Sequence, residues 1–337
     1  MNNSNLKITK EINESLKIIK SGCEELITES ELIKKLLISK KTGKPLCVKL
    51  GIDPTSPDIH LGHTIVIKKM LQLQNLGHNV NLIIGDFTSM IGDPSGRNSS
   101  RIPLSVKKIN SNKHNYLKQF SSIMNISKLK LLNNSDWFNN MRLKDFINIL
   151  SLCTVSNMMK RNDFFNRLKK NIPISINEFI YPLLQGYDSA NLRCDIEIGG
   201  SDQKFNLLLA RDLQKKYGQI PQCIITMPIL EGLDGYEKMS KHKKNYIGLS
   251  ESPDSIFGKV MSISDDLMWK YLKLLLSFNN KKIKLLKSKT KEGFNPRNLK
   301  ILLAKEIVTQ IHDSFEANKS LFRFESIFRY KKKKNKY

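Results

Sequence analysis

A strand, a helix and a second strand within about 40 residues constrain this chain more than any other feature of its sequence. Residues 45–51 form a short apolar run that predicts a buried strand, and residues 80–84 form another. Between them, residues 62–76 carry apolar side chains at helical spacing and stop before Gly77, which suits the position after a helix end. Because a helix joins the two strands, we expect a parallel sheet with helices packed on it.

The same alternation returns later in the chain. Helical patterns at 178–192 and 202–217 are each followed by a short apolar run, at 194–198 and 223–227. The repeated order of elements predicts an α/β fold with a Rossmann-like parallel sheet.

The length predicts more than one domain. The chain has 337 residues, which at roughly 150 residues per domain corresponds to about two domains. At its start, residues 9–40 predict two helices, with Ser30 as an N-cap candidate for the second. Strand patterns fade after residue 250. The predicted organisation is a sheet domain at 1–228 with a helical insertion at about 105–170, a loop and linker at 229–250, an all-helical domain at 251–330 and a basic tail at 331–337.

The charge indicates an anionic partner. Lys plus Arg number 56 and Asp plus Glu number 31, so the formal net charge is +25. Such an excess favours nucleic acid as the partner, ahead of a membrane. The alternative, which stays open at this point, is compositional drift in a chain rich in Lys, Asn and Ile. The apolar content of 40% excludes wholesale disorder.

The cysteines and the chain start favour a cytoplasmic protein. Five cysteines, an odd number without a C-x-x-C pair, make a disulfide framework or a cysteine-rich zinc site an unsuitable explanation. We expect free thiols in a reducing cytosol. The first residues lack the apolar core of a signal peptide, and no apolar run approaches the roughly 20 residues of a membrane span.

A pair of histidines follows the first predicted strand. His60-Leu-Gly-His63 places two imidazoles on one side of a helix start, where the N–H groups and the helix dipole favour an anion. Gly62 has no side chain, so a flat ligand can approach the backbone. Metal binding does not suit the spacing, because no third ligand is near. Two ordinary surface histidines remain the alternative.

A pair of lysines follows the last predicted strand. Lys238-Met-Ser-Lys241 lies in a loop, and two lysines three residues apart can close over a polyphosphate. By itself the motif is equally explained by a solvated basic loop. The two motifs in this order, one after the first strand and one after the last, resemble the two signatures of class I aminoacyl-tRNA synthetases.

Further motifs narrow the resemblance to one family. From about residue 10 to about residue 330 the chain is similar to bacterial-type tyrosyl-tRNA synthetases. The tryptophanyl enzymes share the fold and both signatures but do not combine Tyr181, Gln185 and Asp188 in this way. The matching stretches are Gly51-Ile-Asp-Pro-Thr-Ser-Pro-Asp-Ile-His-Leu-Gly-His63, Gly85-Asp-Phe-Thr88, Ile91-Gly-Asp-Pro-Ser-Gly96, Tyr181-x-x-x-Gln185-x-x-Asp188 and Gly199-Gly-Ser-Asp-Gln203.

The resemblance implies an ATP site where the parallel strands end. His60 and Thr55 are expected at the phosphates, and His63 at the ribose and the reaction centre. Gly62 belongs to the same ATP site. Asp202 is expected to bind the ribose hydroxyls, and it could equally be a helix N-cap. Two lysines, Lys238 and Lys241, are expected to stabilise the leaving pyrophosphate, and Lys241 also contacts ATP.

The resemblance also implies a tyrosine site. Asp188 is expected to accept the hydrogen bond of the phenol, and Gln203 to approach the carboxylate. A substrate without the hydroxyl leaves a buried carboxylate unpaired, which costs its desolvation; discrimination against phenylalanine is a known property of this family. The alternative for Tyr181, Gln185 and Asp188 is that they form one polar stripe on an amphipathic helix. The ammonium is expected among Asp53, Asp93, Tyr181 and Gln185.

The implied activity is ligation of tyrosine to its tRNA with ATP, in two steps through tyrosyl-adenylate. Mg²⁺ is expected to accompany ATP on its phosphates, with no metal held by the protein. The family works as a symmetric homodimer, and no membrane is involved. The alternatives are a tryptophanyl enzyme, or an RNA-binding protein of this fold that has lost catalysis.

Several positions depart from the family pattern. After Lys241 the usual small hydroxyl residue, Leu, Gly and Asn are replaced by His242-Lys-Lys-Asn245. Lys49 stands where one branch of the family has a tyrosine, and we expect it to point away from the phenol. Arg97 and Arg101 are candidate phosphate contacts.

The C-terminal part also differs from the pattern. Bacterial relatives usually carry a further RNA-binding domain of roughly 80 residues, small by domain standards. A solvated tail is the usual explanation of a terminal lysine run such as 331–336. The hypothesis beside it is that this run and the basic stripe at 281–291 supply contacts to tRNA phosphates.

Overall fold

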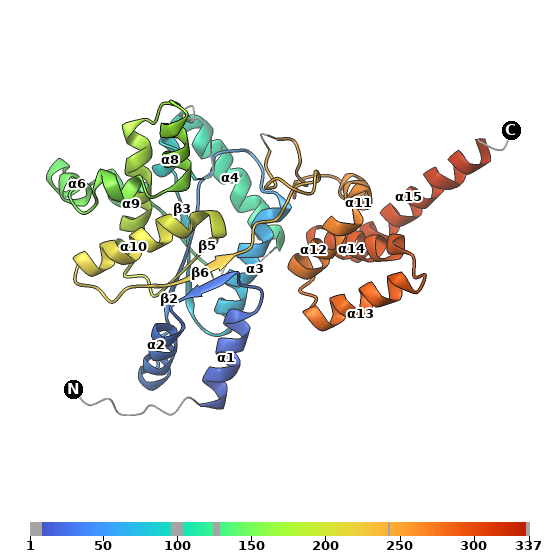
Figure 1. The fold of residues 1–337 in the computed structure, drawn as a ribbon, viewed down its shortest axis with the longest axis horizontal. Coiled ribbons are helices and arrows are strands. Elements are labelled where there is room, and N and C mark those ends of the chain that lie inside the picture. Colours follow the sequence, from blue (N-terminus) through green and yellow to red (C-terminus); the bar gives the residue numbers. More distant parts are fainter. Residues whose placement is uncertain (1–8, 96–103, 124–128, 242, 335–337) are drawn as a thin grey trace. The chain divides into compact units, whose positions relative to one another are not determined.

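The computed structural model describes residues 9–95, 104–123, 129–241 and 243–334, without the side chains of 122 and 328–334 (Figure 1). It divides into two compact units. The sheet unit comprises Met1–Pro57, Val66–Tyr116 and Ile126–Pro228, and the helical unit comprises Asp58–Ile65, Leu117–Asn125 and Ile229–Tyr337.

The sheet unit contains the predicted parallel sheet. Within the described residues it has six strands in the order β1-β6-β5-β2-β3-β4, and only the β1–β6 pair is antiparallel. The four predicted strands are confirmed, and two short edge strands, β1 and β4, were not predicted. The strands are β1 (Glu25–Ile27), β2 (Cys47–Ile52), β3 (Asn79–Ile84), β4 (Lys130–Asn133), β5 (Ile196–Gly200) and β6 (Cys223–Met227).

The strand order reverses between β2 and β5. From β2 the chain continues to β3 on one side, whereas β5 and β6 extend the sheet on the other side. In open α/β sheets the carboxyl ends at such a reversal form the ligand site. Here Asp53 directly follows β2, and Asp202 follows β5 by two residues.

Helices surround the sheet within this unit. The two-helix prediction for 9–40 is confirmed, but α2 begins at Glu29 after Thr28, so Ser30 lies inside the helix and is not its N-cap. The helix after β2 ends before Gly77, which has φ +87°. The helices are α1 (Lys10–Lys20), α2 (Glu29–Thr42), α3 (Leu61–Asn75), η1 (Thr88–Met90), α4 (Val106–Ile123), α5 (Ser135–Phe138), α6 (Leu143–Leu150), α7 (Val155–Met158), α8 (Asn162–Lys169), α9 (Ile176–Leu192), η3 (Ser201–Gln203) and α10 (Lys204–Lys216).

Helix α9 is positioned by its cap and by a close approach to α10. Its start has a capping box, in which Ser175 accepts from the helix and Glu178 accepts from the Ser175 N–H at 2.9 Å. At Gly186 a Cβ atom would lie 2.4 Å from Leu213 Cδ1 and 3.2 Å from Ala210 Cα. The absence of a side chain there brings the two helices together and holds the polar face of α9 in place.

The helical unit contains the predicted C-terminal helices. Four of these helices begin with a Ser or Asn side chain that accepts a backbone hydrogen bond. Its core includes fully buried Phe257, Tyr271 and Leu303. Among the described residues no helix is long and apolar enough to span a membrane. The helices are α11 (Pro253–Ser262), α12 (Asp265–Leu275), α13 (Asn280–Lys291), α14 (Pro296–Ile311) and α15 (Ser314–Lys334).

Candidate active site

Asp53 is held by two hydroxyl groups at the end of β2. Tyr181 Oη donates to Asp53 Oδ2 at 2.9 Å, and Thr88 Oγ1 donates to Asp53 Oδ1 at 2.8 Å. Gly85 permits this arrangement, because a Cβ there would lie 2.0 Å from Asp53 Oδ1 and 2.3 Å from Thr88 Oγ1. The structure thus joins two of the predicted ammonium ligands, from β2 and α9.

Asp188 lies buried at the other end of the same hydrogen-bonded chain. Trp137 Nε1 donates to Asp188 Oδ1 at 2.9 Å, and Asn134 Nδ2 donates to Asp188 Oδ2 at 3.4 Å. Asn134 Nδ2 also donates to Thr88 Oγ1 at 3.0 Å. The polar chain therefore runs from the carboxylate of Asp53 to that of Asp188 inside the sheet unit.

Burial decides the protonation of Asp188. Its side chain is 4% exposed, and desolvation raises its pKa to about 7. The positive charge of Lys49 and the hydrogen bonds from Trp137 and Asn134 oppose this rise in the pKa, whereas the charge of Glu197 adds to it. Asp188 therefore titrates near neutral pH and gains in acceptor strength as it ionises.

A second group joins the remaining predicted tyrosine ligands. Gln203 Nε2 donates to Asp93 Oδ2 at 2.7 Å. Asn206 Nδ2 donates to Gln203 Oε1 at 3.1 Å and to Gln185 Oε1 at 2.9 Å. Arg161 in turn donates to Asn206 Oδ1 at 2.9 Å. Asn206, which is fully buried, connects the three predicted residues.

Five residues of these two groups were not predicted. Thr88 stood in a matching stretch but received no role. Asn206 lies on α10, three residues after Gln203, and that spacing could have indicated it. The remaining three, which come from the helix-rich stretch between β3 and α9 where no motif marks them, are Asn134, Trp137 and Arg161.

Lys49, which we expect to point away from the phenol, has a role in the sheet that the sequence analysis did not assign. Its side chain is fully buried, and its ammonium forms an ion pair with Glu197 at 2.8 Å. It also donates to Gln185 O at 2.9 Å and to Ser189 Oγ at 2.7 Å. Glu197, its ion-pair partner, is its register neighbour on the adjacent strand β5.

The predicted ATP ligands of the sheet unit lie in turns. Thr55 is half-buried, and its N–H donates to Asp53 O at 2.8 Å. Asp202 lies in η3, and a Cβ at Gly200 would come within 2.4 Å of Asp202 Oδ1. The alternative of an N-cap is wrong, since Gln203 precedes α10 as its N-cap residue and makes no side-chain capping bond.

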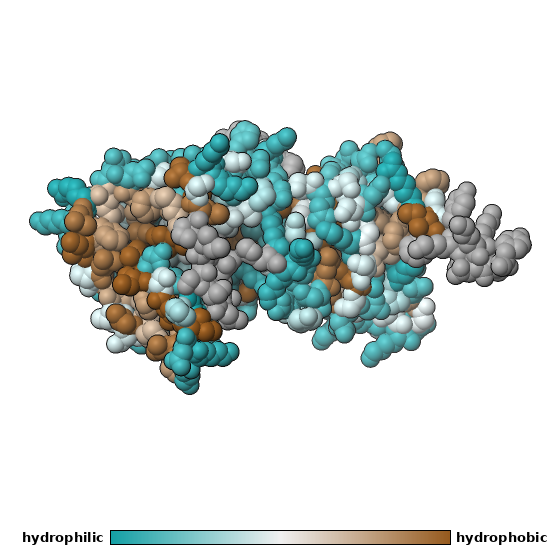
Figure 2. All heavy atoms as spheres, turned by 90° about the horizontal axis from the view of Figure 1, so that it is seen from above, coloured by the Kyte–Doolittle hydropathy of each residue, from teal (hydrophilic) through white to brown (hydrophobic). Residues whose placement is uncertain are grey.

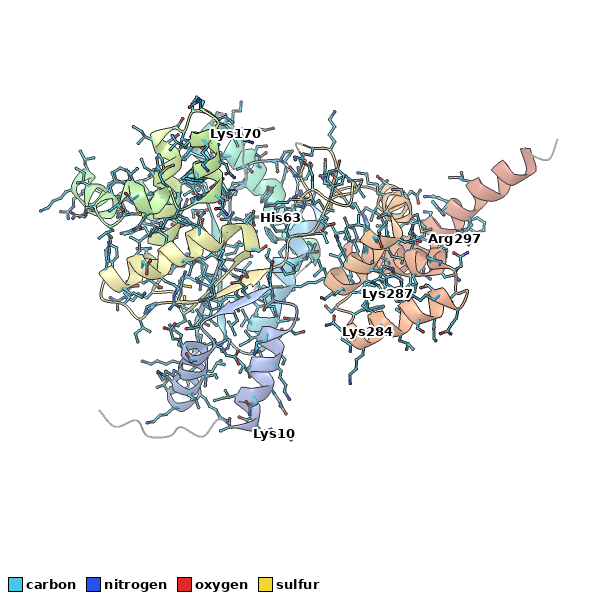
Figure 3. All side chains as sticks on the ribbon, in the orientation of Figure 1. Lys10, His63, Lys170, Lys284, Lys287 and Arg297 are labelled. Carbon is cyan, nitrogen blue, oxygen red and sulfur yellow. The ribbon has the colours of Figure 1, made fainter. Side chains whose placement is uncertain are left out.

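In the helical unit the two histidines are fixed by backbone pairing. Leu61 N donates to Ile247 O at 2.8 Å, and Leu249 N donates to Ile59 O at 2.9 Å. The imidazole rings of His60 and His63 lie 4.0 Å apart between centroids and are tilted by 50°. Figure 3 labels His63, which lies near the start of α3.

Burial favours the neutral form of both imidazole rings, and one ring nitrogen of His60 makes no hydrogen bond to the described residues. Burial lowers the pKa of both; that of His63 falls to about 4, and the charges of Lys238 and Lys241 act in the same direction. His60 Nδ1 is buried and has no hydrogen-bond partner among the described residues. A Cβ at Gly62 would lie 3.0 Å from this nitrogen. An approaching polar group of a ligand can satisfy it.

The lysine motif, residues 238–241, lies in the helical unit on a loop that is held by hydrogen bonds. Met239 N donates to Leu230 O at 2.9 Å. Asn245 Oδ1 accepts from Ser240 N at 2.8 Å, and Asn245 Nδ2 donates to Lys238 O at 3.3 Å. Burial lowers the pKa of Lys241 to about 8, which the charge of Asp58 opposes.

The departures after Lys241 have local consequences. Lys244, where the family usually has Gly, adopts the left-handed conformation with φ +54°, which is costly for a residue with a Cβ. Lys243 forms an ion pair with Glu237. The three remaining candidates, His242, Arg97 and Arg101, lie outside the described residues.

Within the described part of the chain, no group of three or more His, Cys, Asp or Glu side chains could hold a metal ion.

The parallel sheet and the histidine and lysine motifs define a class I aminoacyl-tRNA synthetase. The family model of class I tRNA synthetases (W and Y), the tryptophan and tyrosine enzymes, matches residues 40–329, and the chain belongs to this family. Within the family, the similar curated proteins include tyrosine enzymes. The tyrosine--tRNA ligase of Bordetella avium (strain 197N) is 52% identical over 329 residues, which cover 98% of this chain and 80% of that protein.

Other relatives agree. The tyrosine--tRNA ligase of Cupriavidus pinatubonensis is 51% identical over 317 residues, covering 94% of this chain and 77% of that protein. In fold, the chain resembles a C-terminally truncated mitochondrial tyrosyl-tRNA synthetase of Aspergillus nidulans, with a TM-score of 0.77, 21% identity, and coverage of 95% of this chain and 97% of that one. The relatives support tyrosine aminoacylation and not the tryptophanyl alternative.

Proposed function

We propose that this chain ligates tyrosine to its tRNA in two ATP-dependent steps. The observation that carries the proposal is the hydrogen-bonded chain with a carboxylate at each end, Asp53 and Asp188, in the sheet unit. Tyrosine has a hydrogen-bond donor at each end, an ammonium and a phenol, so it matches two carboxylates. Phenylalanine has no side-chain donor to place against Asp188, and the relatives support tyrosine over tryptophan.

The roles proposed for the tyrosine ligands are those that the family resemblance implies. Asp53 and Tyr181 bind the ammonium, together with Asp93 and Gln185. Gln203, whose amide is already oriented by Asp93 and Asn206, approaches the substrate carboxylate. Each of these polar groups is oriented before the substrate arrives, which lowers the cost of ordering on binding.

We propose that ATP is bound by residues of both motifs. The unpaired His60 Nδ1 accepts or donates to a phosphate oxygen, depending on its tautomer. His63 contacts the ribose near the reaction centre, and Gly62 leaves space for the nucleotide. Asp202 binds the ribose hydroxyls, and Thr55 contacts the phosphates.

In the first step a carboxylate oxygen of tyrosine attacks the α-phosphorus of ATP. A new P–O bond forms as the bond to the β-phosphate oxygen breaks, and pyrophosphate leaves. Lys238 and Lys241 stabilise the charge that develops on pyrophosphate, and we propose that 229–250 is the loop that brings them to it. In the second step a terminal ribose hydroxyl of tRNA attacks the acyl carbon, and AMP leaves.

The helical domain at 251–330 is proposed to contact tRNA. In Figure 3, Lys284 and Lys287 extend from α13 and Arg297 from α14. Helix α13 has no buried residue, and its lysines are available for phosphate contacts that release counterions. The lysine run at 331–336 lies outside the described side chains.

We further propose a homodimer in the cytoplasm. Large apolar side chains are exposed on the helical insertion of the sheet unit, among them Leu143 at 72% and Val155 at 70%, and at the start of α9, where Ile176 is 80% exposed. Figure 2 shows hydrophobic residues gathered at the side where Figure 1 draws α6 and α10. A second copy is the occupant that the family implies for such a face, and sedimentation of the unmutated chain tests it.

Pyrophosphate exchange tests the proposed activity. The purified chain should exchange pyrophosphate into ATP with tyrosine and only feebly with tryptophan or phenylalanine. Asp188→Ala should weaken tyrosine binding and narrow the gap to phenylalanine, because the phenol loses a charged acceptor. Faster exchange with tryptophan would contradict the proposed substrate.

A further inference from the structure

Lys49 is placed in the sheet unit so that all of its ammonium hydrogens are used. Lys49 and Glu197 are register partners on neighbouring parallel strands, β2 and β5. Their side chains form an ion pair at 2.8 Å with 0% and 1% exposure. The two other donors of Lys49 go to Gln185 O and Ser189 Oγ, at 2.9 Å and 2.7 Å.

These two acceptors lie on either side of Asp188 along α9. Ser189 directly follows Asp188, and Gln185 precedes it by three residues. Lys49 therefore binds the helical turn that carries the proposed tyrosine ligands Gln185 and Asp188. It contacts Gln185 through the backbone carbonyl of that residue. The ammonium connects this turn to the centre of the sheet.

The partner carboxylate is itself saturated. Glu197 Oε2 accepts from Ser189 Oγ at 3.0 Å and also from Gln222 Nε2. Two opposite charges, Lys49 and Glu197, thus lie side by side in a closed network next to the α9 turn. Their charges act on Asp188 in opposite directions, because Lys49 favours its ionised form and Glu197 disfavours it.

A second buried lysine shows what a structural lysine looks like here. Lys69 is 2% exposed, and its ammonium donates to three backbone carbonyls, those of Ile18, Ile19 and Ser21. None of these acceptors belongs to a proposed tyrosine ligand. Lys69 therefore provides a matched control for burial and hydrogen bonding.

We propose that Lys49 is a specificity-determining positioning residue: bonded to α9 on either side of Asp188, it fixes the position and the negative charge of the carboxylate that receives the tyrosine phenol. The inference rests on the proposed function. It adds a residue in β2 that does not touch the substrate but acts through Asp188.

The ionisable groups whose charge acts on Asp188 come from two strands, Lys49 from β2 and Glu197 from β5. From the other side it contacts Trp137 and Asn134, which do not titrate. Removal of one strand charge at a time therefore moves the ionisation of Asp188 in a known direction.

The test measures kcat/KM for tyrosine and for phenylalanine by pyrophosphate exchange between about pH 6 and pH 9, where Asp188 changes charge. Lys49→Met should lower kcat/KM for tyrosine about ten-fold near neutral pH, the factor that corresponds to one pKa unit, and less at high pH. The value for phenylalanine should change little, so selectivity falls. Lys49→Arg should restore part of the lost selectivity for tyrosine over phenylalanine, and Lys69→Met should leave this selectivity unchanged.

Glu197→Gln keeps Lys49 and removes the opposing charge, so its tyrosine profile should shift toward lower pH, the opposite direction to that of Lys49→Met. If Lys49→Met does not fold, the direction of the pH shift in Glu197→Gln alone tests the inference. Equal losses for tyrosine and phenylalanine at every pH, or profiles shifted in the same direction in both variants, would overturn the inference alone. An unmutated chain without tyrosine-dependent exchange would overturn the proposed function and the inference with it.

Discussion

The proposed tyrosine ligands of the sheet unit and the histidine and lysine motifs of the helical unit are built in opposite ways. In the sheet unit, side chains from several strands and helices bond to one another, and Asp188 and Asn206 are buried. In the helical unit the backbone is fixed by pairing around His60 and by Asn245, whereas His60 Nδ1 is left for a ligand.

The difference corresponds to two tasks. Recognition of a small substrate needs charges and dipoles that are oriented in advance, because any reorganisation is subtracted from binding. Stabilisation of a leaving pyrophosphate needs cations that meet charge only as it develops. We therefore expect substitutions in the two regions to separate into effects on tyrosine binding and effects on rate.

The largest effect is expected at Lys238. Lys238→Ala should raise the activation barrier for tyrosine activation by about 2–4 kcal/mol, the range for loss of one preorganised charge contact. It should therefore lower kcat with little change in tyrosine KM. Single-turnover formation of the adenylate measures it. Lys243→Ala, in the same loop and paired with Glu237, is the control and should be mild. A raised tyrosine KM with unchanged kcat would remove the separation between the two regions.

An intermediate effect concerns stability and pH at Asp188. Burial raises the pKa of this carboxyl to about 7 in the folded protein, above its ordinary 3.8. The folded state therefore keeps a proton that the unfolded state loses, so this group's contribution to stability is full below about pH 4 and is lost as pH rises through about 7. The free energy of unfolding should fall by up to about 1.4 kcal/mol per pH unit over that window.

Asp188→Asn does not titrate and should lack this fall. Urea unfolding at several pH values measures the difference between the variant and the unmutated chain, which should grow from about pH 4 to 7 and then level off. Asp145→Asn is the control, because Asp145 is exposed and its pKa is lowered by the hydrogen bond from Arg142. A constant difference at Asp188 across this range would show that its carboxyl is not desolvated.

The smallest effect is expected at Lys244. Lys244→Gly should stabilise the loop by on the order of 1 kcal/mol, since glycine adopts φ near +54° without the Cβ clash. Lys244→Ala separates the two causes, because it removes the charge and keeps the Cβ. Thermal unfolding and the kcat of activation report on both variants. If Ala and Gly behave alike, charge and not backbone conformation distinguishes this loop from its relatives.

The central strands and both motifs were predictable because each is a local pattern. The edge strands β1 and β4 were not, since three or four partly exposed residues carry little periodicity. Asn134 and Trp137 reach Asp188 across more than fifty residues of chain, which only the tertiary structure reveals. The burial of Lys49 did carry a signal, because a lysine in an otherwise apolar strand requires a buried partner, and Glu197 lies in the apolar run 194–198.

The interleaving of the two units in sequence limits how this protein can be divided. The segment Asp58–Ile65 belongs to the helical unit although it lies between β2 and most of α3. Its partner for backbone pairing, around Gly248, is almost two hundred residues later. A fragment cut after Pro228 would keep His60 but lose the strand-like segment that fixes it. Gene fusion or exchange of the C-terminal half would therefore have to carry both segments together, which keeps the histidine motif and the lysine motif in one unit.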